Sequence, residues 1–183
     1  MNEALIYLIT VVFDLYFMVV ILRIWLQLVR ADFYNPFSQF IVKATHPIVA
    51  LMRRILPSIG SLDTASVVLA LLVVVAKILL LTLMAGEDFN LVATLIFALV
   101  SLFKKAGVLL FWILIIRAIL SWVSQGRNPI EYVMMQLTEP LLAPIRRFLP
   151  PMGGLDLSLL VLMVLMNFVN ILLAKTIPFW AIA

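Results

Sequence analysis

Two stretches of the chain share one spaced pattern of proline, arginine and aspartate residues. Residues 35–63 read N-P-x10-P-x5-R-R-x2-P-x5-D, and residues 128–156 repeat this pattern with every interval unchanged. Of the 29 aligned positions, 12 are identical. Each copy is a polar, proline-rich connector between two long apolar stretches. The pattern therefore predicts a duplicated unit, in which two membrane helices form a hairpin around a structured loop.

The composition places the chain in a lipid bilayer. Of its 183 residues, 66% are hydrophobic and only 12% are charged, which is too apolar for a soluble globular protein. The formal net charge is +4, but the basic residues lie in short loops beside apolar runs and form no clustered face, so we expect no nucleic-acid partner. The chain has no cysteine and one histidine, His46, so we expect no metal site and no cofactor.

Four segments have the length and apolar character of a membrane-spanning helix, which needs about 20 residues. They are residues 4–29, 64–84, 106–123 and 157–177. We therefore predict an all-α membrane protein built from two helical hairpins. The first repeat covers residues 1–84 with its connector at 30–63, and the second covers 106–183 with its connector at 124–156.

Residues 85–105 between the repeats are harder to place. The apolar run 89–103 is short for a span, and it lies between Glu87-Asp88 and Lys104-Lys105, as the helix dipole prefers. We expect a segment at the outer interface, or an outward extension of the third membrane helix. If the run crossed the membrane by itself, the second repeat would be inverted relative to the first.

The distribution of lysine and arginine predicts the orientation. The two connectors carry most of these residues, and the opposite side has three. The connector residues are Arg30, Lys43, Arg53, Arg54, Arg127, Arg146 and Arg147; the others are Lys104, Lys105 and Lys175. By the positive-inside rule, the connectors face the cytoplasm and both termini face the periplasm of a bacterial inner membrane.

Each connector contains two prolines that are followed by apolar residues. Because proline is tolerated mainly in the first turn of a helix, we predict a short helix after Pro36 and another after Pro47, with the same layout in the second copy. Thr45 and Thr138 are placed to cap the second short helix. These elements are expected at the membrane interface or as re-entrant pieces.

Charged residues lie near the end of each connector. The arginine pairs Arg53-Arg54 and Arg146-Arg147 either anchor the connector at the headgroups or bind one anionic ligand together. Asp63 and Asp156 directly precede the second and fourth membrane helices, so we predict that they are helix N-caps.

Asp14 and Lys77 are charges at membrane depth. An unpaired charge there costs at least about 2.5 to 3.5 kcal/mol, so each needs a partner or water. They lie about 24 and 21 Å from the connector ends of their helices, so the hairpin brings them to a similar depth. Both are absent from the second repeat, where Val108 and Asn170 occupy the aligned positions. We expect an ion pair that either sets helix register or belongs to a proton or cation path.

Four further polar residues fall within membrane segments. Arg23 and Arg117 align with each other and are close enough to the connector side to snorkel. Asn167 and Asn170 lie three residues apart on one helix face, where amides more often bridge helices than bind ions.

The duplicated pattern, with A-T-H-P-I-V at 44–49 and L-T-E-P-L-L-A-P-I-R-R-F-L-P-P-M-G-G-L-D at 137–156, closely resembles the YggT family of small bacterial inner-membrane proteins. The resemblance covers nearly the whole chain, although Leu51 replaces the proline found at Pro144 in the second copy. It implies the two-repeat proteobacterial form. Members have been linked to osmotic or salt tolerance, to cell division or nucleoid organisation and, in plastids, to maturation of a cytochrome complex. The family defines no catalytic residue.

Two functions follow as hypotheses. The first is a non-enzymatic inner-membrane protein that supports osmotic-stress tolerance and envelope homeostasis, through assembly with itself or with other membrane proteins. The alternative is a cation transporter or channel subunit, for K+ or H+, that uses the Asp14 and Lys77 charges. An enzyme is not expected, because the sequence has no Ser/His/Asp set, metal-ligand cluster or phosphate-binding glycine loop.

Overall fold

The computed structural model describes residues 3–123, 128–149 and 156–183, and these residues form six α-helices and no strand. They are α1 (Glu3–Leu28), α2 (Pro36–Met52), α3 (Thr64–Ala85), α4 (Leu91–Val123), α5 (Pro129–Phe148) and α6 (Leu157–Thr176). Four of them, α1, α3, α4 and α6, are long and apolar enough to cross a membrane. The predicted fold class, an all-α multi-pass membrane protein with four spans, is therefore confirmed.

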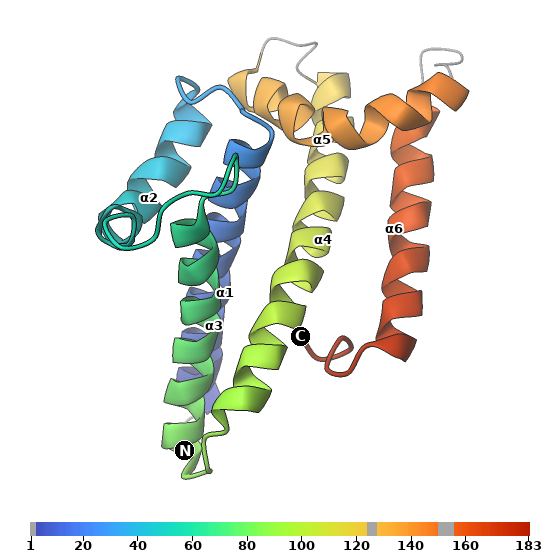
Figure 1. Ribbon diagram of the computed structural model, residues 1–183. Helices are drawn as coiled ribbons and strands as arrows, with labels where there is room; N and C mark the ends of the chain where they lie inside the picture. The colour runs from blue at the N-terminus through green and yellow to red at the C-terminus, as the bar shows by residue number, and fades with distance from the viewer. Residues whose placement is uncertain (1–2, 124–127, 150–155) are drawn as a thin grey trace.

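The four long helices form two antiparallel hairpins that point the same way (Figure 1). Helices α1 and α3 form the first hairpin, α4 and α6 form the second, and both connector helices lie at the same end of the molecule. A tight turn joins the hairpins at the other end, where Gly86 closes α3 with a left-handed backbone (φ +70°) that glycine adopts without steric cost. The repeats are thus parallel copies.

Residues 91–105, which the sequence left between two placements, are the first turns of α4. They continue without a break into the third membrane helix, so α4 is 33 residues long. Ala98 and Ser101 in this part are buried, and α4 packs against both α1 and α3. The segment is therefore an outward extension of the third span that docks on the first repeat.

Each described connector contains one helix that runs through its internal prolines. Pro47 lies inside α2, and Pro140 and Pro144 lie inside α5, so the prediction of two short helices per connector is wrong. Proline removes one backbone donor, but neighbouring groups can bind the carbonyls near a proline and keep the helix intact. Pro47 removes the backbone donor for the Lys43 carbonyl, and the adjacent Val42 carbonyl accepts from the Arg23 guanidinium of α1 (3.3 Å).

The two connector helices begin alike and lie differently. Asn35 and Asn128 each cap the helix through the side-chain oxygen, with proline at the first helical position. In Figure 1, α5 lies across the ends of α4 and α6, whereas α2 leans obliquely along the first hairpin. The Asn35 amide also donates to the Pro129 carbonyl (2.7 Å), which joins the starts of the two connectors.

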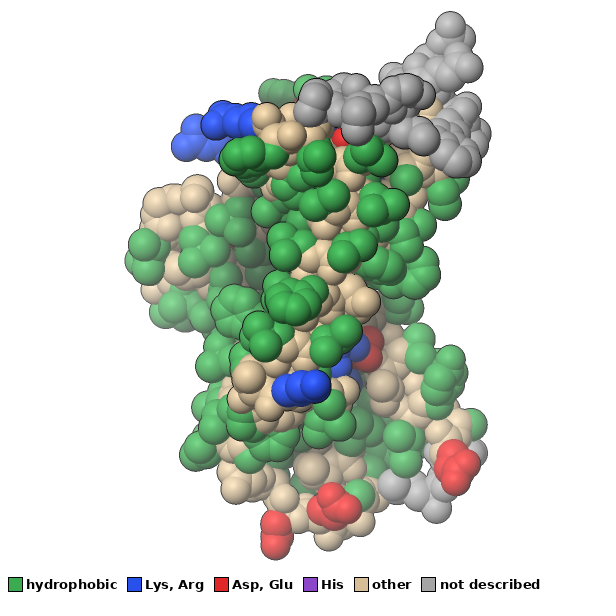
Figure 2. Space-filling view, turned by 90° about the vertical axis from the view of Figure 1, so that its right-hand side faces the viewer, with side chains coloured by type: hydrophobic (Ala, Val, Ile, Leu, Met, Phe, Trp, Pro, Cys, Tyr) green, Lys and Arg blue, Asp and Glu red, His purple; other side chains and the backbone are tan. Residues whose placement is uncertain are grey.

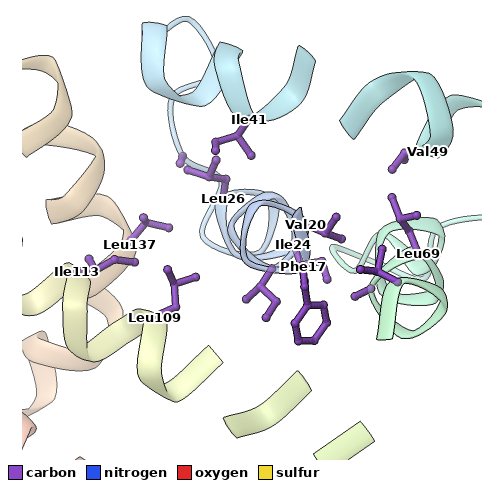
Figure 3. Close-up of a cluster of buried hydrophobic side chains, with 14 of the residues drawn as sticks. Phe17, Val20, Ile24, Leu26, Ile41, Val49, Leu69, Leu109, Ile113 and Leu137 are labelled. Carbon is purple, nitrogen blue, oxygen red and sulfur yellow. The ribbon is translucent and has the colours of Figure 1, made fainter. Parts of the chain in front are cut away.

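The core is centred on α1. Figure 3 shows Phe17, Val20 and Ile24 of this helix facing side chains from the helices around it. The buried partners include Ile41 and Val49 of α2, Leu69 of α3, Leu109 and Ile113 of α4, and Leu137 of α5. The second hairpin has a smaller buried cluster of its own, made of Leu110, Leu114, Leu142 and Leu162. Most of the buried apolar contact therefore belongs to the first repeat.

The outer surface between the two ends is mainly hydrophobic. Figure 2 shows this for one face, where acidic side chains gather at the end opposite the connectors. An apolar girdle of this kind is what a bilayer requires of the helices that it surrounds. Charged side chains that lie within the girdle are therefore the first places to look for a functional site.

Candidate functional site

The predicted Asp14 and Lys77 charges meet inside the first hairpin. Lys77 Nζ of α3 donates to Asp14 Oδ1 of α1 over 2.7 Å. A third residue joins them, because Lys105 Nζ of α4 lies 3.4 Å from Asp14 Oδ2. The three side chains are only 15 to 29% exposed. One carboxylate thus ties together three helices, and Lys105 links the second repeat to the first.

Lys105 was expected at the far interface and was missed as a partner. Counting along straight helices puts its backbone about 4.5 Å farther from the connector end than Asp14, and an extended lysine side chain covers that distance. The sequence contained the needed signal, since Lys105 and Asp14 lie at similar distances from the connector ends of parallel helices. The sequence did not reveal that α4 packs beside α1, and the contact between Lys105 and Asp14 depends on that packing.

A second cluster fixes the first connector to its hairpin. Arg23 of α1 is buried, and its Nη1 donates to the Thr45 hydroxyl in the middle of α2 (2.7 Å). Arg53 at the end of α2 holds Asp63 with two contacts, Nε to Oδ1 (3.3 Å) and Nη2 to Oδ2 (2.7 Å). Arg23 Nε is 3.9 Å from the same Asp63 carboxylate. Two guanidinium groups therefore share one carboxylate.

The second repeat builds the same cluster with one more acid. Arg117 is buried and donates to the Thr138 hydroxyl, and its Nη2 lies 3.5 Å from Glu139 Oε2. Arg146 binds Glu139 through Nη1 (2.8 and 3.0 Å) and Asp156 Oδ2 through Nε and Nη2 (3.1 and 2.6 Å). Two guanidinium groups here face two carboxylates.

The positions of the threonines and arginines differ from expectation in two ways. Thr45 and Thr138 are not helix caps: each is buried in mid-helix, bonds back to a carbonyl one turn earlier and accepts from an arginine. Arg23 and Arg117 do not snorkel, since each turns into the protein and its charge-assisted bonds offset burial. Each arginine and its threonine partner are identical in both repeats, and that was the signal that could have revealed them.

Asp63 and Asp156 both occupy N-cap positions but use them differently. The Asp63 side chain makes no cap bond and instead accepts from the Ser66 hydroxyl (2.6 Å), whereas Asp156 accepts from the Ser158 amide (3.1 Å) as a cap does. Burial raises the pKa of the Asp63 carboxyl, but hydrogen bonds from Arg53 and Ser66 outweigh it and hold the pKa below its usual value. Asp156 shows the same balance with Ser158 and Arg146, and its pKa is also lowered.

The remaining predicted residues lie at the surface. Arg54 and Arg147 are exposed; Arg53 is exposed as well but binds Asp63, and Arg146 is half-buried. Asn167 and Asn170 are exposed on α6 and bridge no helices in the described part of the chain. Asn170 accepts instead from the Trp180 indole of the C-terminal tail (2.9 Å). The described residues contain no group of three or more His, Asp or Glu side chains placed to hold a metal ion.

The chain is similar to other bacterial proteins over almost its full length. It is 59% identical over 177 residues to an uncharacterized protein of Vibrio alginolyticus, covering 95% of this chain and 96% of that one. It is 46% identical over 179 residues to the uncharacterized protein YggT of Escherichia coli K12, covering 96% and 92%. No solved structure matches the chain. The CCB3/YggT family model matches residues 2–84 and 96–177, one match for each hairpin, and the chain therefore belongs to the CCB3/YggT family.

Proposed function

We propose that the protein is a non-enzymatic inner-membrane protein that supports osmotic-stress tolerance and envelope homeostasis through membrane assembly. The observation that carries the proposal is the Asp14 triad. Its carboxylate binds lysines from α3 and α4, so it joins the two repeats into one frame. A charge held by two fixed partners is suited to setting helix positions, because moving any one helix would leave a charge unpaired at membrane depth.

The surroundings of the triad also favour a structural role. A hollow of about 350 Å³ between α1, α2 and α3 reaches the depth of the triad, since Phe13 and Ala76 line it. Seven of the eight residues around it are aliphatic or phenylalanine, among them Val12, Leu69 and Leu72, and the eighth, Tyr16, contributes a single hydroxyl. A conduction path for ions would need polar groups or water along its length.

In this proposal the connectors face the cytoplasm and both termini face the periplasm. The excess of lysine and arginine in the connectors supports that orientation. The exposed arginines, Arg54 and Arg147, then lie at the level of anionic headgroups and hold the connectors there. Assembly with a second copy or with other membrane proteins takes place through the apolar outer faces of the spans.

The second candidate function is a cation transporter or channel subunit. It is favoured by the charge of the triad, because two lysines face one aspartate whose side chain is 29% exposed. Protonation of Asp14, or entry of an ion, would change that balance.

A complementation experiment separates the two functions. A strain that lacks the gene is grown under hyperosmotic stress with wild-type protein, with Asp14→Asn, or with the triad neutralised by Asp14→Val, Lys77→Asn and Lys105→Leu. If the triad only fixes the frame, the neutral triple variant restores growth at matched membrane abundance. Ion flux through wild-type protein in liposomes, abolished in the triple variant although it folds, would overturn the structural proposal in favour of transport.

A further inference from the structure

The first connector borders a hollow that is rich in cationic groups. It has a volume of about 520 Å³ and lies between α1 and α2 at the connector end of the molecule. Its lining includes Arg23, Lys43, His46 and Arg53, together with apolar and amide side chains. This size is that of a small-molecule or headgroup site, and it exceeds what one inorganic phosphate needs.

The charges around this hollow do not balance. Arg23, Arg53 and Lys43 contribute three cations, and Asp63, bound to Arg53, is the carboxylate next to them. Arg23 is only 4% exposed, and its Nε lies 3.9 Å from Asp63 Oδ2, too far for a hydrogen bond, and has no other hydrogen-bond partner among the described residues. A buried guanidinium donor without a partner costs free energy that an incoming acceptor would recover.

The second repeat shows what would fill the position. There Glu139, which aligns with His46, places its carboxylate against both Arg146 and Arg117. Gln136 stands where the first repeat has Lys43, so the second cluster is both more acidic and less basic. The two guanidinium groups of the second repeat thus contact a second carboxylate, that of Glu139, and the corresponding two groups of the first repeat have only Asp63.

We infer that the first connector binds a phosphate group in this hollow, held by Arg23, Arg53 and Lys43 in the place that Glu139 fills in the second repeat. Arginine forks and a lysine ammonium are the groups that proteins use for phosphate oxygens. The phosphate comes either from an anionic lipid headgroup or from a free phosphate. Lys43 and His46 line the hollow and are both exposed, so the site is open to solvent or lipid headgroups. The site goes beyond the proposed function and does not depend on it.

The test uses the full-length protein and measures thermal unfolding. In detergent, inorganic phosphate is compared with chloride at matched ionic strength; in nanodiscs, phosphatidylcholine alone is compared with phosphatidylcholine plus phosphatidylglycerol. We expect phosphate or the anionic lipid to raise the melting temperature by several degrees. A rise with the lipid alone identifies a headgroup, a rise with inorganic phosphate alone identifies a free anion, and a rise with both identifies a site that accepts either source.

A variant that copies the second repeat sharpens this test. His46→Glu with Lys43→Gln should weaken the apparent affinity for the probe at least tenfold, while the melting temperature without the probe stays equal to that of the wild type or higher. Lys104→Gln with Lys175→Gln is the matched control, because these lysines lie outside the lining, on spanning helices and not on the connectors, and the formal charge changes by the same amount. The inference is overturned if neither probe stabilises the protein beyond its control, or if both double variants lose the response equally.

Discussion

The two connectors are built on one pattern and end in different electrostatic states. In each connector a buried arginine of the preceding span donates to a threonine in the middle of the connector helix. A second arginine, near the end of that helix, forms an ion pair with the aspartate before the next span. In the second connector Glu139 completes the cluster, whereas His46 stands at that position in the first. The shared arginines, threonines and aspartates fix each connector to its hairpin. The residue that differs, His46 or Glu139, determines whether the two arginines of the cluster face one carboxylate or two.

The hairpins differ in a second way. The first contains the Asp14 triad and most of the buried apolar cluster, while Val108 and Asn170 replace Asp14 and Lys77 in the second. Lys105 of α4 reaches across to the first hairpin, so the second hairpin depends on the first for its position. Both repeats therefore retain the arginine cluster that fixes the connector, whereas only the first repeat contains Asp14, which joins the two repeats.

The largest effect is expected from labelling, which tests whether the repeats are parallel. The chain has no cysteine, so single cysteines can replace the exposed Tyr34 in the first connector, Tyr132 in the second and Glu87 at the opposite end. An impermeant thiol reagent added to intact cells should label only the cysteine at position 87. Labelling of one connector but not the other would mean that the repeats are inverted.

The next effect is on stability and concerns the triad. Asp14→Asn leaves two lysines unpaired and should cost about 3 to 5 kcal/mol of unfolding free energy in detergent. Neutralising all three charges should recover most of that loss, because the three side chains act as one unit. Equal and additive losses from the single changes would show that the side chains do not interact. Val108→Ala, at the aligned position of the second hairpin, breaks no ion pair and should cost much less than Asp14→Asn.

The buried arginines should differ in the cost of removing them. Arg117→Met leaves Glu139 and Asp156 to share Arg146 and should cost about 2 kcal/mol, because two carboxylates then face one cation. Arg23→Met leaves Asp63 paired with Arg53 and should cost about 1 kcal/mol. Methionine keeps most of the side-chain volume in both cases. Chemical denaturation of the two variants in the same detergent measures the order, and a larger loss for Arg23→Met would contradict the difference in charge balance.

Lysine substitutions in the connector arginine pairs should distinguish the arginines that bind carboxylates from those that anchor the connector at the headgroups. Arg146→Lys loses contacts with two carboxylates and should cost about 1.5 kcal/mol, and Arg53→Lys somewhat less because its side chain is more exposed. Arg54→Lys and Arg147→Lys should be nearly neutral, since an ammonium anchors equally well at the headgroups. Thermal unfolding of the four single variants tests this, and equal losses at all four positions would show that the pairs act as units.

Much of this architecture could be predicted from the sequence because the signals were long and repeated. Four apolar runs of spanning length predicted the membrane helices, and the duplicated pattern predicted matching hairpins. The connector helices were predicted as two pieces each, because proline rules describe a helix in isolation, whereas here α2 packs on α1 and its Val42 carbonyl, close to Pro47, accepts from Arg23.

The candidate site was only partly predictable, for a similar reason. Asp14 and Lys77 could be paired from their depths within one hairpin, but Lys105 could not, since its contact depends on how the two hairpins dock. Asp63 and Asp156 could be placed at helix starts from the sequence. Whether each carboxylate accepts from the backbone as a cap, or only from neighbouring side chains, depends on which side chains lie near it in the folded protein. Arg23 with Thr45 and Arg117 with Thr138 were visible only as residues retained in both copies.

The most direct test of the difference between the connectors is to give the second one the residue of the first. Glu139→His should lower the melting temperature in phosphate-free buffer, because Arg117 and Arg146 lose a carboxylate. If that position determines whether an anion is supplied by the chain or taken from outside, the probe that stabilises the wild type, inorganic phosphate or phosphatidylglycerol, should then raise the melting temperature of this variant by more than it raises that of the wild type. An identical response of the two proteins to that probe would contradict this conclusion.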